Sequence, residues 1–114
     1  MAMIIKSYDF GQITVNQELF TSDLIIYSGK INSSWWRKKG HLLQLVDINA
    51  IINEKPEVIV IGTGYYGYMK IAKEVIKKLE DLSIKFYIEK TKKAVDLFNS
   101  IDSNNIIAAF HLTC

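Results

Sequence analysis

The chain has 114 residues, which is enough for one compact domain with a sizeable core and too few for separate cofactor and substrate domains. Its net charge of +2, with 49% hydrophobic and 23% charged residues, is too mild to indicate nucleic acid or an anionic membrane as a partner. No apolar run approaches the roughly 18 residues that a membrane span needs. The first residues lack the pattern of a signal or transit peptide, so we expect a cytoplasmic protein.

The first half of the chain has the patterns of short strands separated by turns. Alternating apolar residues predict antiparallel strands near residues 3–8 and 12–16, and a short apolar run predicts another near residues 23–27. Residues 30–43 have no clear periodicity, so we expect a loop there. A short helix that Asp47 can cap is expected to follow.

The second half of the chain alternates strands with helices. Strands are predicted near residues 58–61, 84–88 and 106–112, with an amphipathic helix after the first and a helix capped by Thr91 after the second. Such alternation is typical of crossover connections, so we expect the three strands to be mutually parallel. The predicted fold is therefore α/β, with residues 1–114 forming a single compact domain with a mixed central sheet, in which N-terminal antiparallel strands precede a βαβαβ unit. The N-terminal strands either complete this sheet or add a layer.

A glycine-rich segment, Gly62-Thr63-Gly64-Tyr65-Tyr66-Gly67, lies between the first of these strands and the expected helix. It matches a dinucleotide-binding pattern, in which unpaired N–H groups at a helix start attract anions, and Glu89 follows at about the spacing of a ribose-binding acid. A nicotinamide enzyme normally uses two such halves, and this chain has residues for one. We therefore predict that no dinucleotide cofactor binds and that the glycines have structural roles. Gly62 and Gly64 are expected to have positive φ, and Gly67 is expected to allow close packing of helix and strand. A weaker anion site at the helix start is the alternative.

The expected loop contains Trp35-Trp36-Arg37-Lys38-Lys39-Gly40-His41. Adjacent aromatic residues beside three cations are compatible with nucleic acid, with a protein partner, or with a tryptophan that fills the core among solvated cations. Because the net charge is mild and no nucleic-acid module is recognised, we predict protein or ligand contact and no nucleic acid. Neighbouring side chains of an extended chain point apart, so one tryptophan is expected to face outward. Replacing that tryptophan and Arg37 by alanine is expected to cost less than about 1 kcal/mol, as for surface residues.

The sequence ends in Phe110-His111-Leu112-Thr113-Cys114. In a strand, His111 and Thr113 share one face and Cys114 lies on the other, so we predict no metal site and assign no catalytic residue. The single cysteine has no partner for an internal disulfide. If the strands are parallel as predicted, His111 and Thr113 lie at the same sheet edge as the glycine segment, where open α/β sheets place ligand sites.

Four sequence features occur in order along essentially the whole chain. They are Ser7-Tyr8-Asp9-Phe10-Gly11, Lys55-Pro56-Glu57-Val58 leading into Ile61-Gly62-Thr63-Gly64, Thr91 with Ala94-Val95, and the terminal Phe110-His111-Leu112-Thr113-Cys114. In this combination the chain resembles the adipogenesis-associated domain family, whose relatives include a mitochondrial factor for assembling respiratory complex I. The resemblance implies a compact α/β domain with a mixed central sheet. It assigns no catalytic residue, because none is established in that family.

Two function classes follow from these observations. The first is a non-enzymatic binding or assembly module that contacts a protein partner, and the alternative is a small-molecule or anion-binding protein, possibly an enzyme, that uses the glycine segment at a helix start. A closed cavity at the sheet edge would favour the alternative, and a flat apolar patch would favour the module. The sequence indicates neither an oligomeric state nor a role for Cys114. The candidate surface residues are Trp35, Trp36, Arg37, Gly62, Thr63, Gly64, Tyr65, His111 and Thr113.

Overall fold

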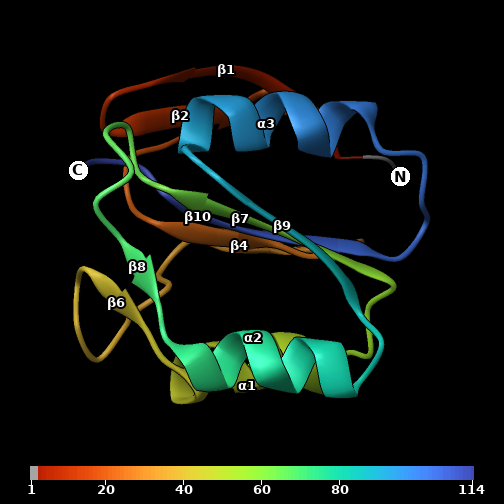
Figure 1. The fold of residues 1–114 in the computed structure, drawn as a ribbon. Helices are drawn as coiled ribbons and strands as arrows, with labels where there is room; N and C mark the ends of the chain where they lie inside the picture. Colours follow the sequence, from red (N-terminus) through yellow and green to blue (C-terminus); the bar gives the residue numbers. More distant parts are fainter. Residues whose placement is uncertain (1–2) are drawn as a thin grey trace.

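The computed structural model describes residues 3–114, which fold around a five-stranded mixed sheet (Figure 1). The strands lie in the order β5-β4-β10-β7-β9. Their bounds are Ile31–Asn32 for β5, Leu24–Ile26 for β4, Ile106–His111 for β10, Val58–Thr63 for β7 and Lys85–Glu89 for β9. Strand β7 is parallel to both β10 and β9, whereas β4 is antiparallel to β10 and to β5. The predicted α/β fold with three mutually parallel strands is confirmed.

A layer of other elements covers each face of this sheet (Figure 1). One face carries helix α3 and a separate antiparallel sheet, with bounds Thr91–Ser100 for α3, Ile5–Asp9 for β1, Gln12–Val15 for β2 and Glu18–Phe20 for β3. The other face carries two helices and a short parallel pair, with bounds Leu45–Asn53 for α1, Lys73–Asp81 for α2, Leu42–Leu43 for β6 and Lys70–Ile71 for β8. Both alternatives for the N-terminal strands are therefore found, because β4 and β5 extend the central sheet while β1 to β3 add a layer.

Strand β7 shows why the sheet is buried on both faces. All of its residues are buried, and successive side chains point to opposite sides. Ile59 and Ile61 pack with α1 and α2, whereas Val58 and Val60 pack with α3 and the smaller sheet. A continuous apolar run is what a central parallel strand with two covered faces requires. No helix within residues 3–114 combines the length and the apolar composition needed to cross a lipid bilayer.

The helix starts differ from those expected, although Asp47 does take part in capping the first helix. Helix α1 is capped by Gln44, and Asp47 is its third residue, whose Oδ2 accepts a hydrogen bond from Gln44 N at 2.8 Å. Helix α3 follows Lys90 as its N-cap, so Thr91 is its first helical residue and its hydroxyl bonds elsewhere. The glycine segment does not lead directly into a helix. Pairing of β8 with β6 keeps the chain extended, and α2 begins only at Lys73.

Candidate functional site

The predicted site residues near the chain end lie at the carboxyl edge of β7 and β10. His111 is aligned with Thr63 in the parallel ladder, as the sequence predicted. Beyond the strands, the last residues run along the glycine segment, where Tyr65 N donates to the Thr113 carbonyl at 2.6 Å and Tyr68 N donates to the Cys114 carbonyl at 2.9 Å. The chain end and the glycine segment therefore form one hydrogen-bonded edge.

The glycines of this segment have structural roles that differ from those expected. Gly64 and Gly67 have positive φ values of 110° and 75°, a region that L side chains rarely adopt. Gly62 lies in β7 without a positive φ, and a Cβ there would come within 2.7 Å of both Phe110 Cδ1 and Thr91 Oγ1. The expected roles of Gly62 and Gly67 are thus exchanged, since Gly62 provides the close approach and Gly67 the turn.

Thr91 ties the first turn of α3 to this edge. Its Oγ1 donates a hydrogen bond to the His111 carbonyl at 2.6 Å and accepts one from Gly64 N at 2.9 Å, and its own N–H donates to the Gly64 carbonyl at 3.1 Å. The glycine segment therefore contacts the start of α3, and α2 begins elsewhere. The helix that the alternative anion site required does not directly follow the glycine segment, and the amides of Gly64 and Thr91 already have partners within the protein.

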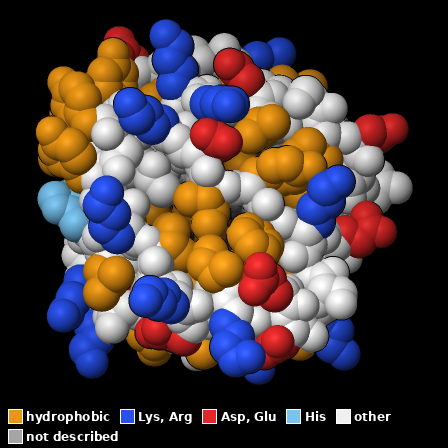
Figure 2. All heavy atoms as spheres, in the orientation of Figure 1, with side chains coloured by type: hydrophobic (Ala, Val, Ile, Leu, Met, Phe, Trp, Pro, Cys, Tyr) orange, Lys and Arg blue, Asp and Glu red, His pale blue; other side chains and the backbone are white. Residues whose placement is uncertain are grey.

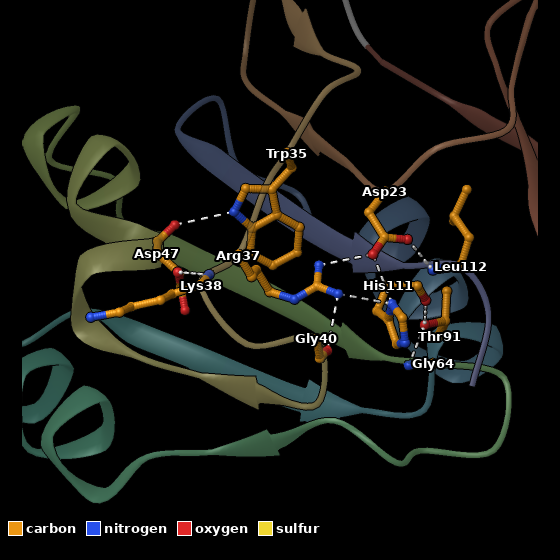
Figure 3. Close-up of polar contacts among 10 residues, drawn as sticks. All are labelled: Asp23, Trp35, Arg37, Lys38, Gly40, Asp47, Gly64, Thr91, His111 and Leu112. Carbon is orange, nitrogen blue, oxygen red and sulfur yellow. Dashed lines mark hydrogen bonds and ion pairs between the residues drawn. The ribbon is translucent and has the colours of Figure 1, made fainter.

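An ionic cluster of the buried Arg37 and His111 and the partly buried Asp23 lies beside the same edge (Figure 3). Asp23 Oδ2 is 2.7 Å from His111 Nδ1 and 2.8 Å from Arg37 NH1, and its Oδ1 accepts a hydrogen bond from Leu112 N at 2.7 Å. Arg37 NH2 donates to the Gly40 carbonyl at 3.1 Å. No carboxylate that orients His111 was predicted, and Asp23, which directly precedes β4, supplies it.

Asp23 determines which ring nitrogen of His111 is protonated. With a carboxylate oxygen at 2.7 Å, Nδ1 carries a proton and donates it to Asp23, so the 3.1 Å approach of Arg37 NH2 to Nδ1 is a packing contact between two donors. Nε2 is buried and has no hydrogen-bond partner within residues 3–114. Burial opposes ionisation of Asp23, but hydrogen bonds from His111 and Leu112 and the nearby Arg37 outweigh it, so the pKa of Asp23 is lowered.

The loop that contains both tryptophans is anchored to the core. Trp35 is buried, its Nε1 donates to the Asp47 carbonyl at 3.1 Å, and the Arg37 guanidinium lies 4.7 Å from the centre of its ring. Trp36 is 76% exposed, so the prediction that one tryptophan faces outward is confirmed. Arg37 is only 9% exposed, and its expected place among tolerant surface residues is wrong. Trp35 and Arg37 hold the loop in place, and Trp36 is left on its outer side.

Half-exposed aromatic rings cover the outside of the carboxyl edge. We call Phe10, Tyr65, Tyr66 and Tyr68 the aromatic surface, and their exposed fractions run from 38% to 57%. Ring centres are 5.7 Å apart for Phe10 and Tyr65, 5.1 Å for Tyr65 and Tyr66, and 5.8 Å for Tyr66 and Tyr68. Figure 2 shows apolar side chains gathered along the left margin, the side on which the C-terminus lies in Figure 1. Sequence reasoning named only Tyr65, although three tyrosines within four residues of a glycine-rich loop are a signal that could have been used.

His41 joins the aromatic surface to the ionic cluster. Its ring centre is 6.4 Å from that of Tyr68 and 5.9 Å from that of His111. The end of the tryptophan loop therefore lies beside Tyr68, the residue that follows the glycine segment. Two hollows, of about 530 and 630 Å³, lie elsewhere, and none of the predicted surface residues lines them. Within residues 3–114, no three His, Cys, Asp or Glu side chains come together as a metal site would need.

Comparison with known proteins gives the family. Residues 5–111 match a family described as "Protein of unknown function (DUF498/DUF598)". The chain belongs to this family. A conserved hypothetical protein from Pyrococcus horikoshii OT3 has a similar crystal structure, with 27% identity, a TM-score of 0.84, and coverage of 98% of this chain and 100% of that one.

Two further solved structures share the fold at lower identity. One, described as an outer membrane protein from Bartonella henselae, is 20% identical with a TM-score of 0.82, over 99% of this chain and 97% of that one. The other, from Bordetella pertussis, is described as a Mth938-like domain and is 18% identical with a TM-score of 0.67, over 96% and 85%. At these identities the likeness shows the fold alone.

Proposed function

We propose that this protein is a non-enzymatic binding or assembly module that contacts a protein partner through the aromatic surface. The observation that carries the proposal is the continuous contact of four half-exposed rings along one sheet edge. Tyrosine and phenylalanine bury a large area at a small cost in side-chain entropy, and aromatic residues are enriched in the energetically dominant parts of interfaces. Contiguous exposed apolar patches on small proteins usually mark interaction sites.

The backbone beneath the rings is held in place before any partner binds. The amides of Tyr65 and Tyr68 donate hydrogen bonds to carbonyls at the chain end. Gly64 N donates to the Thr91 hydroxyl, and the Gly64 carbonyl accepts from Thr91 N. A surface fixed in this way loses little conformational freedom on association, which favours affinity. The resemblance to the adipogenesis-associated domain family, which includes a complex I assembly factor, also supports an assembly role.

The surrounding charges indicate the chemistry of the partner. A Cβ at Gly67 would lie 3.0 Å from Lys90 Cγ, so a lysine side chain borders the glycine segment that carries the tyrosines. An apolar protein segment bordered by acidic residues would complement this surface. Trp36, which lies outside the aromatic surface, stays a predicted contact for the partner. The cytoplasmic location stays a prediction from sequence.

The test compares capture by matched variants. Wild type, the double variant Tyr66→Ser with Tyr68→Ser, and the control Leu19→Ser are immobilised, since Leu19 is a 57% exposed apolar residue of β3 in the other layer. The double variant is expected to enrich a true partner from extract at least about tenfold less than wild type, and the control is expected to enrich it as well as wild type. Titration of the purified partner is expected to give the same ratio of affinities between wild type and the double variant. Equal capture by all three forms contradicts the proposal. Thermal unfolding of each variant ensures that only folded protein is compared.

One observation favours a second candidate function, the binding of a small molecule. His111 Nε2 is buried and unpartnered while Asp23 orients the ring through Nδ1, an arrangement that leaves one nitrogen free to accept a hydrogen bond. A thermal-shift screen with nucleotides, phosphates and sugar acids tests it, because a ligand that binds only the folded state raises the melting temperature. A shift of several degrees that His111→Gln abolishes would favour this candidate over the binding module.

A further inference from the structure

Strand β9 is an edge of the central sheet and is open on its outer side. It is the last strand in the order β5-β4-β10-β7-β9, and in Figure 1 it crosses in front of β7 with no other ribbon before it. Its three middle residues, Phe86, Tyr87 and Ile88, are only half-buried. Figure 2 shows apolar side chains in the middle of this face, bordered by charged ones. An open edge strand with apolar side chains is a template for pairing with another strand.

The backbone geometry of β9 defines which groups are available. Lys85 N donates to the Glu57 carbonyl at 3.1 Å, so Lys85 directs its backbone groups to β7. In a parallel ladder, alternate residues do the same, which assigns Tyr87 and Glu89 to β7 as well. The N–H and C=O groups of Phe86 and Ile88 therefore point away from the sheet.

The sequence of β9 is complementary to itself when reversed. It reads Lys85-Phe86-Tyr87-Ile88-Glu89, with a cation at one end, an anion at the other and apolar residues between. Antiparallel pairing centred on Tyr87 sets Lys85 of one copy opposite Glu89 of the other, on the same face and twice per pair. It also sets Phe86 opposite Ile88, which are the residues whose backbone groups point outward, so each such pair exchanges both backbone hydrogen bonds.

We propose that two copies of this chain associate through β9, antiparallel and with the two-fold axis at Tyr87, so that their central sheets become continuous. Opposite charges directly across an antiparallel pair are favourable and like charges are unfavourable. Parallel pairing in register would instead set Lys85 against Lys85, and shifts by two residues remove both Lys–Glu pairs. The same charges thus select one register and oppose the others.

The contacts that these charges make within one copy are too weak to prevent this pairing. Glu89 Oε2 is 3.7 Å from Lys93 Nζ, and both side chains are well exposed. Lys85 Nζ is 5.8 Å from the centre of the Tyr87 ring. Exposed ion pairs of this kind contribute little, so Glu89 and Lys85 are free to turn toward a second copy.

A charge-reversal cycle tests the proposal by sedimentation equilibrium of the full chain. Wild type is expected to dimerise reversibly, Lys85→Glu and Glu89→Lys each to weaken the dimer at least about tenfold, and the double variant to recover most of the affinity. Lys6→Glu, which makes the same charge change on exposed β1, is expected to leave the dimer unchanged. A monomeric wild type, or single variants that dimerise like wild type, would overturn the proposal.

Cysteine cross-linking tests the register separately. In a Cys114→Ser background, Tyr87→Cys sets two thiols opposite each other in a non-hydrogen-bonded pair, where Cα atoms are about 4.5 Å apart and a disulfide fits. Lys85→Cys faces Glu89 of the other copy and should not cross-link. Rapid dimer formation by Tyr87→Cys alone supports the pairing, and equal cross-linking of the two variants refutes it. Neither test involves the aromatic surface, so failure here leaves the proposed binding function unaffected.

Discussion

Replacement of Arg37 by alanine is expected to destabilise the fold by about 3 kcal/mol. The Arg37 side chain is 5% exposed and pairs with Asp23 at 2.8 Å, and removing one partner of a buried ion pair typically costs about 3–5 kcal/mol because the other charge is left uncompensated. Asp23 keeps its bonds to His111 and Leu112 N, which lowers the cost, while lost contact with the Trp35 ring adds about 0.5–1 kcal/mol. For a domain of this size the melting temperature should fall by roughly 10 °C.

Urea unfolding over a range of pH values measures this loss, with Lys39→Ala as the exposed control from the same loop. Asp23 has a lowered pKa in the folded state, so it stabilises the fold above the unfolded pKa near about 4 and this contribution is lost as pH falls through the folded pKa. Without Arg37 that pKa rises, so the difference between wild type and Arg37→Ala should shrink below about pH 4. A loss under about 1 kcal/mol, equal to that of Lys39→Ala, would show that Arg37 belongs to the surface as its sequence context suggested.

Three further changes probe the carboxyl edge, each by urea unfolding. Gly64→Ala should cost at least about 2 kcal/mol, because φ is 110° and the new Cβ would overlap the Cys114 backbone, whereas Gly29→Ala enters open space and should be neutral. Thr91→Val keeps the volume but removes both hydroxyl hydrogen bonds, and a loss of about 3 kcal/mol is expected. Burial raises the pKa of Tyr8 to about 12, so stability should fall as pH rises from the unfolded value of 10 toward 12. Tyr8→Phe should reduce this dependence and leave the part due to Tyr27, whose pKa burial also raises.

The elements that sequence predicted best are those whose pattern is local. The run at residues 58–61, bounded by Pro56 and glycine, is typical of a buried strand, and the alternation after it requires parallel pairing. Asp47 contributes to the cap of α1 from the third helical position instead of the N-cap position. Thr91 is a good cap by residue type, yet its hydroxyl donates to the His111 carbonyl in the folded chain. Strands β6 and β8 have two residues each and leave almost no pattern to detect.

The ionic cluster was not predictable from spacing, because Asp23 and His111 are 88 residues apart and meet only when β4 lies antiparallel beside β10. The inward position of Arg37, in contrast, was predictable from the sequence. Side chains of an extended chain alternate, so a buried Trp35 with an exposed Trp36 implies that Arg37 also points inward. The run of three cations made Arg37 look like a surface residue. Lys38 and Lys39 are indeed exposed, but Arg37 shares only their positive charge.

The most distinctive sequence motifs and the proposed contact surface serve different purposes. Gly64, Thr91 and the last residues bond to one another and fix the carboxyl edge, while the rings that can meet a partner lie outside that network. A change in the network should therefore lower stability, and lower binding only in proportion to the folded protein that is lost. A change at Tyr66 should lower binding with little effect on stability. Measured side by side, these two patterns separate a residue that builds the edge from one that acts at it.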